Sequence, residues 1–151
     1  MASEIAQIAQ SVLDRCLCKR TRAAARAITR VYDDELRETG LRPSQVEVLV
    51  TVAANSELSI TALAEELGMD RTTLTRNLRP LEKRGLIALS SEGRHRTRLV
   101  RLTPTGEAAL GGLIGHWERA QTAMERQLGN EGVASVRRAS AAIASASRTV
   151  G

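Results

Sequence analysis

Residues 71–83 place polar and basic side chains along one face of a predicted helix. At 100° per residue, four side chains fall within roughly 60° of one another: Thr72, Arg76, Arg79 and Lys83. The opposite face carries leucines, at positions 74, 78 and 81. An arginine can bind guanine through two hydrogen bonds, and a threonine can contact a thymine methyl group or a phosphate. This outward row therefore has the chemistry of base recognition in a major groove, although a solvated helix exterior is the alternative.

A second group of arginines lies in the polar segment 90–98, between two short apolar runs at 86–89 and 99–102. This pattern is typical of a β-hairpin with a basic tip. The tip would carry Arg94, Arg96 and Arg98. Such side chains can follow phosphates or enter a minor groove, whose negative potential attracts arginine. The alternative is a flexible surface loop without a ligand.

The positive charge of the chain is concentrated around these two groups. The 151 residues have a formal net charge of +5. Between Asp70 and Arg101 there are nine bases and three acids, a net charge of +6, which leaves 13 bases and 14 acids in the remainder. A basic surface of this kind attracts polyanions, and we expect the partner to be nucleic acid.

Cys16 and Cys18 form a third group that could do chemistry. Neighbouring bases favour the thiolate, which is the reactive form and binds soft metals. On a continuous helix, residues two apart point about 200° away from each other, so a bridge between the two cysteines would require local unwinding. A bond to a second chain or to a distant residue is sterically easier. The alternative is that both are small apolar side chains that only pack.

The composition excludes several other classes of protein. The only histidines are His95 and His116, and no nucleophile elbow or phosphate-binding glycine loop is present, so we expect neither an enzyme nor a bound cofactor or metal. Phenylalanine is absent, which argues against a platform that stacks single-stranded bases. No apolar run is long enough for a membrane span or a signal peptide, and we expect a cytoplasmic protein.

The helix over residues 71–83 can present its outward row only if a neighbouring element holds it in place. The preceding residues predict such an element. Ser59 can cap a short helix that ends at Gly68, and Asp70 can cap the helix that carries the row and ends at Gly85. Two short helices joined by a glycine-containing turn are typical of a helix-turn-helix. Pro80 lies inside the second helix, where we expect a kink or an early last turn.

Longer helices flank this unit on both sides. Residues 4–37 predict one long helix or two in succession, and a capping box at 44–47 predicts a helix to about residue 54, with Val46, Leu49, Val50 and Ala53 on one face. Thr103 and Pro104 start another helix that runs to about Leu128, with one apolar stripe: Leu110, Leu113, Ile114, Trp117, Met124 and Leu128. Its four glycines suggest close backbone approach to another helix, or space for a ligand. A last, weakly apolar helix needs a partner surface, which favours a homodimer.

The order of these elements, with four sequence motifs, resembles the MarR family of winged-helix transcriptional regulators over nearly the whole chain. The motifs are Gly40-Leu41-Arg42-Pro43-Ser44-Gln45, Leu63-Ala64-Glu65-Glu66-Leu67-Gly68-Met69, Leu81-Glu82-Lys83-Arg84-Gly85-Leu86-Ile87 and Arg98-Leu99-Val100-Arg101-Leu102-Thr103-Pro104-Thr105-Gly106. The resemblance implies a mainly α fold with a small two-stranded wing. It assigns a winged helix-turn-helix domain to residues 40–103 and a helical dimerisation domain to residues 1–39 and 104–151.

The same resemblance implies how such a protein works. It predicts a homodimer that binds double-stranded DNA at an inverted-repeat operator and acts as a repressor. Thr72, Thr73, Arg76 and Arg79 would recognise bases, and Arg96 would be the wing-tip arginine. Two other functions stay open: an architectural DNA-binding dimer without effector control, and a winged helix that binds proteins.

Members of the family are commonly released from DNA by small aromatic acids, other phenolics or thiol oxidation. An effector pocket would lie near three side chains, Tyr32, His116 and Trp117, and near the glycine-rich stretch, although ordinary packing explains these residues as well. The resemblance also places Cys16 and Cys18 near the dimer interface, where thiol oxidation or a thiophilic metal could act.

Overall fold

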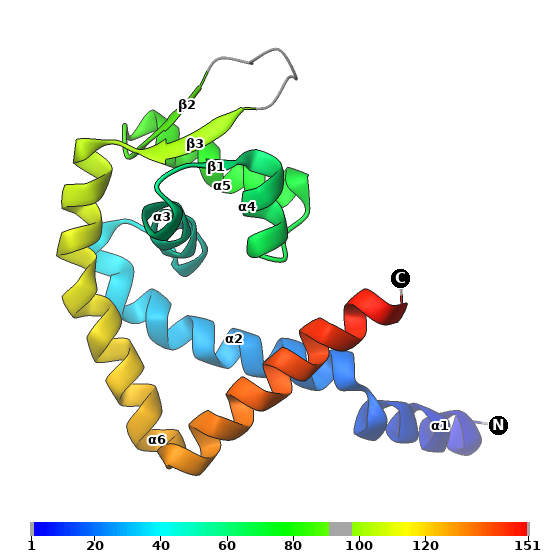
Figure 1. Cartoon of the computed structure of the whole chain (residues 1–151). Coiled ribbons are helices and arrows are strands. Elements are labelled where there is room, and N and C mark those ends of the chain that lie inside the picture. The colour runs from blue at the N-terminus through cyan, green and yellow to red at the C-terminus, as the bar shows by residue number, and fades with distance from the viewer. Residues whose placement is uncertain (1, 91–97, 151) are drawn as a thin grey trace.

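The computed structural model describes residues 2–90 and 98–150 and is mainly helical, with one small antiparallel sheet (Figure 1). The elements in chain order are α1 (Ala2–Arg15), α2 (Leu17–Leu36), the 3-10 helix η1 (Arg37–Thr39), α3 (Pro43–Asn55), β1 (Leu58–Ser59), α4 (Ile60–Glu66), α5 (Arg71–Lys83), β2 (Ile87–Leu89), β3 (Leu99–Leu102) and α6 (Pro104–Val150). The predicted fold class is confirmed. In the described ranges, no helix has both the length and the apolar character that a bilayer crossing needs.

The N-terminal helical segment is broken at Cys16, so of the two predicted alternatives, one long helix or two in succession, the second is correct. The Cys16 backbone is extended, with φ −69° and ψ 104°, and its Sγ accepts a hydrogen bond from the Lys19 N–H at 3.4 Å. The Arg20 guanidinium spans the break and donates to the Asp14 carbonyl at 2.8 Å. Gly40, at φ +66°, follows the end of η1.

The start of α3 differs from the prediction. The helix begins at Pro43, and the Gln45 side-chain oxygen accepts the Arg42 N–H at 3.0 Å. The predicted capping box at 44–47 is therefore wrong, and Ser44 instead donates to the Asn77 Oδ1 of α5 at 3.1 Å. The inward face was also predicted only in part: the buried residues are Val46, Val48, Leu49 and Val52, whereas Val50 and Ala53 are exposed.

The two caps of the helix-turn-helix are confirmed. The Ser59 hydroxyl accepts the Ala62 N–H at 3.0 Å, and the Asp70 carboxylate accepts the Thr73 N–H at 2.8 Å. Helix α5 continues past Pro80 to Lys83, so it does not end early. The Pro80 carbonyl still accepts a hydrogen bond, from the Arg84 N–H at 3.1 Å, which completes the last turn.

The sheet has three strands in the order β1-β3-β2, one more than predicted. β2 and β3 form the predicted antiparallel hairpin, with Ile87 opposite Leu102. The added strand β1 pairs antiparallel with β3 and places Leu58 opposite Val100. It is only two residues long and precedes the Ser59 cap, which already requires extended backbone. The sheet thus ties the start of the helix-turn-helix to the wing.

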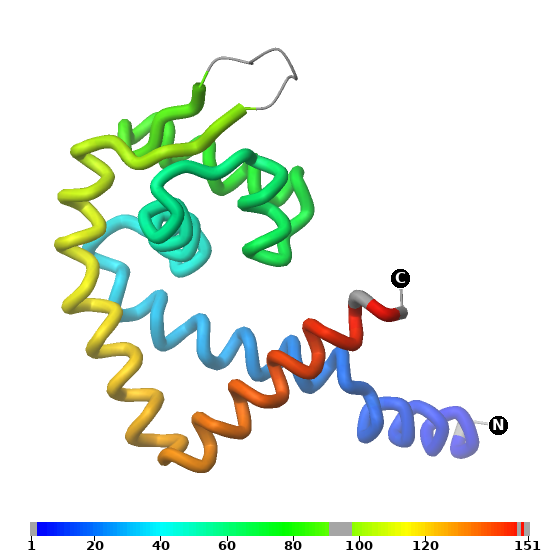
Figure 2. Tube along the Cα trace, viewed as in Figure 1, coloured from blue at the N-terminus to red at the C-terminus, as the bar shows by residue number. Residues whose placement is uncertain are grey.

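Helix α6 begins as predicted, with the Thr103 hydroxyl accepting the Gly106 N–H at 3.0 Å. A Cβ on Gly106 would lie 1.9 Å from the Leu86 carbonyl oxygen, so the predicted close backbone approach is to the entry of β2 and not to a helix. Gly129 is not helical, with φ 64° and ψ 172°, and here α6 turns back in the direction of α2 (Figure 2). The predicted end near Leu128 is therefore confirmed.

The apolar stripe predicted for α6 divides into two parts. Leu113 is buried within the chain, at 3% exposed, as is Ala120, which the predicted stripe did not include, at 0%. Ile114 and Trp117, which were expected on the same stripe, are about half exposed, at 53% and 46%. The main core lies under the winged-helix region and is built from leucine, valine and isoleucine side chains of α3, α4, α5, β2 and β3.

Candidate nucleic-acid interface

The outward face of α5 forms a surface groove of about 360 Å³. Its lining consists of arginines and threonines from the first three turns of the helix: Arg71, Thr72, Thr75, Arg76 and Arg79. Three of them belong to the row that the sequence predicted. Arg71 and Thr75 were missed. They lie four residues apart on the helix, about 100° and 60° to one side of Thr72, and so border the predicted row.

The groove faces solvent because the opposite side of α5 is fixed in the core. Leu74, Leu78 and Leu81 are 0%, 2% and 0% exposed. The Asn77 side chain lies between these two sides, accepts from Ser44 of α3 and donates weakly to the Met69 sulfur at 3.8 Å. Rotation of α5 about its axis would expose these leucines to water, which costs free energy. Their burial therefore fixes the orientation of the outward row.

The N-terminus of α5 is held by Asp70. Its carboxylate accepts from both the hydroxyl and the N–H of Thr73, at 2.5 and 2.8 Å, and these hydrogen bonds hold the pKa of Asp70 below its ordinary value. Thr73 was predicted to recognise bases, and in the free protein its hydroxyl is occupied by this cap. Lys83 lies exposed in the last turn of α5, in line with Thr72 and Arg76.

Arg84, one of the bases in the charged segment, has a structural partner. Its guanidinium donates to the Gly40 carbonyl at 2.9 Å and to the Thr39 carbonyl at 3.3 Å. This contact joins the end of α5 to the turn before α3. Arg84 therefore holds the helix in place and does not extend the row.

The wing is described only at its base. Arg94 and Arg96 lie outside the described residues. Arg98 is half-buried immediately before β3, where its Nε donates to the Ser90 carbonyl at 3.4 Å and its own carbonyl accepts the Ile60 N–H at 3.1 Å. Together these bonds close the base of the hairpin and tie it to α4.

A larger cavity, of about 730 Å³, lies between α2, α3 and α6. It brings together Tyr32 and Trp117, as predicted, with the carboxylate of Glu47 on the α3 side. Burial raises the pKa of Glu47. Burial also raises the pKa of Tyr32, and the nearby Glu125 carboxylate raises it further. The Tyr32 hydroxyl donates to Gln121 at 2.5 Å and so connects α2 to α6.

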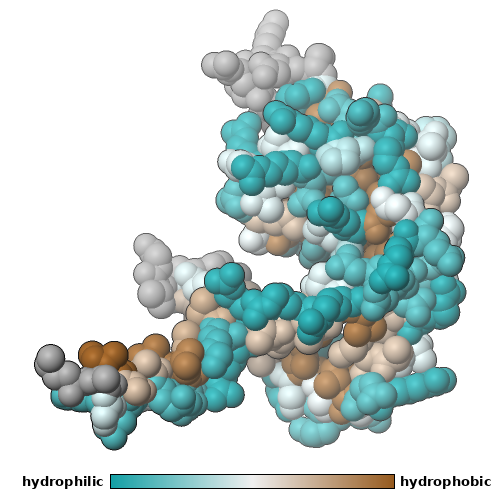
Figure 3. Space-filling view, turned by 180° about the vertical axis from the view of Figure 1, so that it is seen from behind, coloured by the Kyte–Doolittle hydropathy of each residue, from teal (hydrophilic) through white to brown (hydrophobic). Residues whose placement is uncertain are grey.

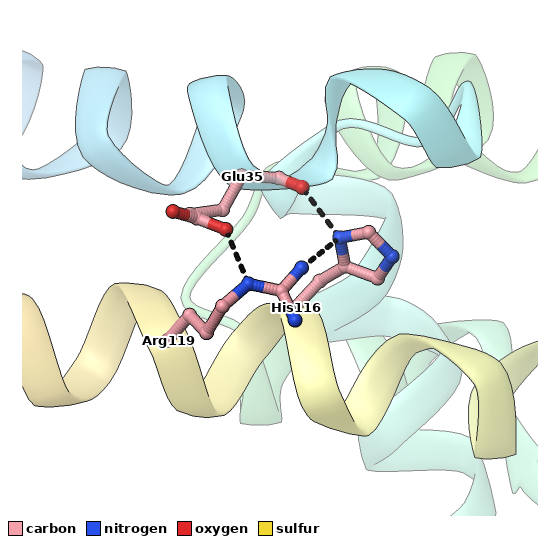
Figure 4. Close-up of polar contacts among 3 residues, drawn as sticks. All are labelled: Glu35, His116 and Arg119. Atoms are coloured by element: carbon pink, nitrogen blue, oxygen red, sulfur yellow. Dashed lines mark hydrogen bonds and ion pairs between the residues drawn. The ribbon is translucent and has the colours of Figure 1, made fainter.

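His116 does not line this cavity, although the sequence predicted an effector pocket near Tyr32, His116 and Trp117 together. Its Nδ1 lies 2.7 Å from the Glu35 carbonyl oxygen and 2.8 Å from an Arg119 nitrogen (Figure 4). A protonated Nδ1 can donate to the carbonyl, and an unprotonated Nδ1 can accept from Arg119, but one state cannot do both. Arg119 also forms an ion pair with the Glu35 carboxylate at 2.9 Å. These residues join α2 to α6.

Both cysteines are free thiols at the break between α1 and α2. Cys16 is half-buried and caps α2, whereas Cys18 is exposed in the first turn. The local unwinding that a bridge within the pair would need is thus present at Cys16. Among the described residues, no cluster of three or more potential ligands that could hold a metal includes them.

An outward arginine groove on the second helix of a helix-turn-helix, followed by a wing, defines a winged helix-turn-helix protein. A MarR family model matches residues 39–97. The regulator SarZ of Staphylococcus epidermidis is 30% identical over 101 residues, which cover 66% of this chain and 68% of SarZ. The chain therefore belongs to the MarR family of transcriptional regulators, and the family predicted from its motifs is confirmed.

Solved structures agree with this assignment. The Mycobacterium tuberculosis regulator MosR, crystallised in complex with DNA, is 32% identical, with a TM-score of 0.81 over 90% of this chain and 98% of MosR. A mutant MarR of E. coli with operator DNA shares the fold, with a TM-score of 0.77 over 87% of this chain and 96% of that one, at 18% identity.

Proposed function

We propose that this protein is a homodimeric, sequence-specific DNA-binding regulator that represses transcription until a signal releases it. The observation that carries the proposal is the groove on α5, where Arg76 and Arg79 face solvent on a helix whose other side is fixed in the core. The solved complexes of MosR and MarR with DNA support the same use of the fold.

In this mechanism α5 enters the major groove and its N-terminal half contacts base edges. Arg76 and Arg79 would donate two hydrogen bonds each to guanine, and Thr72 would contact a thymine methyl group or a phosphate. The wing arginines Arg94 and Arg96 would enter the adjacent minor groove. Residues 40–103 would form the DNA-binding domain, and residues 1–39 and 104–151 would hold the two copies together.

Two features support a release signal. The 730 Å³ cavity joins α2 and α6 to α3, so a ligand bound there would shift the DNA-binding domain relative to the helical domain. Tyr32 and Trp117 favour an aromatic ligand. Cys16 offers a second route, because oxidation of its sulfur would remove the cap at the start of α2.

The rival functions lead to different measurements. An architectural dimer would bind all duplexes with similar affinity, whereas a specific regulator prefers its operator by a factor of roughly 10³ or more. A protein-interaction module would bind no duplex tightly at physiological salt. Membership of the family argues against an enzyme, because the MarR family consists of transcription regulators.

The test is a selection of duplexes from a random pool, followed by measurement of affinity for the selected operator and for an unrelated duplex. We expect an inverted repeat with half-sites about one helical turn, roughly 10 bp, apart. Arg76→Ala and Arg79→Ala should each weaken operator binding by about 1–3 kcal/mol and lower the preference over unrelated DNA. Arg84→Ala is unsuitable as a control because it breaks a structural contact; Arg126→Ala, on α6, is suitable. If both α5 variants keep the parent's preference for the operator over unrelated DNA, the proposal is contradicted.

A further inference from the structure

Helix α2 carries a second basic surface, remote from α5 and the wing. Residues 15–32 contain six bases and no acid. Four of these bases lie on one side of α2, within roughly 80° at 100° per residue: Lys19, Arg22, Arg26 and Arg30. We call them the α2 basic row. All four side chains are exposed.

The charges of this row are not neutralised within the described part of the chain. Over residues 2–90 and 98–150, none of the four side chains forms an ion pair or donates a hydrogen bond. Other arginines of the same region do: Arg20 donates to the Asp14 carbonyl, and Arg37 pairs with Asp34. Like charges three and four residues apart slightly destabilise a helix, so an external counter-charge bound along the row would stabilise α2.

The row lies on the side of α2 opposite its apolar residues. The apolar side of α2, which includes Leu17, Ala24 and Ile28, lies about 180° around the helix axis from the row. Thr29 lies about 60° from the middle of the row and lines the cavity against α3, as does Ile28, whereas none of the four basic side chains lines it. Figure 3 shows hydrophilic side chains along α2 and a hollow between α2 and the winged-helix region. A dimer formed through apolar surfaces therefore leaves these cations exposed.

We propose that the α2 basic row binds a phosphodiester backbone, independently of base sequence. The row covers 12 residues from Lys19 to Arg30, or roughly 17 Å of straight helix between the first and the last, which matches about five phosphates of one DNA strand. The terminal segments of a second copy offer few acids, because α1 carries Glu4 and Asp14 and residues 130–150 carry only Glu131; the acidic run of a second copy, residues 33–35, lies at the far end of its own α2. The inference rests on the proposed function, because DNA is the polyanion that α5 would bring to the molecule.

The phosphates could belong to the operator itself or to the DNA that flanks it. The test therefore uses two duplexes with the same selected operator, of about 20 bp and about 60 bp, and matched random duplexes. Three proteins are compared by fluorescence anisotropy over a range of salt concentrations: the parent, Arg22→Gln/Arg26→Gln, and the control Arg126→Gln/Arg137→Gln. Both variants lose two positive charges from exposed helix positions, so the control corrects for net charge.

We expect the row variant to bind at least roughly tenfold more weakly than the parent at 0.1 M salt, on operator and random DNA alike. Its slope of log K against log salt should fall by about 2, since each lost phosphate contact removes roughly 0.9. The affinity of the control variant should stay within about twofold of that of the parent. If the row variant loses affinity for both operator duplexes, the row contacts the operator backbone. If it loses affinity for the longer duplex alone, the row contacts the flanking DNA.

Three results would overturn the inference. The row variant could bind as the parent does, the control could lose as much affinity as the row variant, or sedimentation could show that the row variant alone dissociates into monomers. The first two would leave the row without a role in DNA binding, and the third would make it a contact between copies. A parent without preference for any selected duplex would contradict the proposed function instead, while the comparison on random DNA would still test the row.

Discussion

Single residues decide whether α5 can present its groove, and Asp70 is the clearest case. Its carboxylate caps the helix through Thr73. Asp70→Ala should lower the Tm by a few degrees, because the orphan N–H groups of the first turn lose their acceptor. Asp70→Asn is the matched variant, since asparagine caps nearly as well and stability near neutral pH should be close to that of the parent.

The same residue gives a pH dependence whose sign follows from its pKa. The folded-state pKa of Asp70 lies below the ordinary value of 3.8, so the charged form stabilises the fold above that pH and is lost as the pH falls through the folded value. Thermal melts at fixed protein concentration, from about pH 5 down to about pH 2.5, should show a larger decrease for the parent than for Asp70→Asn. Parallel curves would show that Asp70 makes no such contribution.

At the scale of elements, the joint between α1 and α2 leads to a prediction about thiols. The Cys16 sulfur accepts the Lys19 N–H, and serine is a good replacement for that role, so Cys16→Ser/Cys18→Ser should fold and bind DNA as the parent does. Peroxide, and separately a thiophilic metal ion, should release DNA from the parent but not from this double variant, as measured by titration of the protein–DNA complex. Identical release curves for the two proteins would show that the cysteines do not mediate release. A ligand bound in the cavity would then be the remaining candidate signal.

The elements also show what the sequence alone could predict. The caps at Ser59 and Asp70, the buried leucines of α5 and the break within α6 at Gly129 followed from local patterns, because each depends on residues a few positions apart. β1, the contact of Gly106 with Leu86 and the bonds of Arg84 depend on residues distant in the sequence, so no local pattern could indicate them. The same reason explains why His116 was expected at the pocket that Tyr32 and Trp117 line and was found bonded to Glu35 instead.

For the whole molecule, the exposed apolar surface predicts a dimer. Ile5, Ile8 and Val12 lie on one side of α1 and are 67%, 55% and 59% exposed. A 14-residue helix with no buried face is marginal in water. Equilibrium sedimentation at micromolar concentration should give about twice 16.3 kDa. Ile8→Asp should shift the protein towards monomer while its winged-helix core stays folded. A parent that sediments as a clean monomer would exclude both the dimer and the two-half-site operator.

The central claim is that the outward face of α5 recognises bases, and a loss-of-contact measurement tests it most directly. Each base pair of the selected operator is changed symmetrically in both half-sites, and affinities are measured for the parent and for Arg76→Ala. If Arg76 binds a guanine, changing that base pair should weaken binding of the parent by about 1–3 kcal/mol per half-site and should leave binding of the variant almost unchanged. Changes at the other positions should weaken binding of both proteins equally. If Arg76→Ala retains the parental cost at every position, the α5 groove does not recognise bases through Arg76.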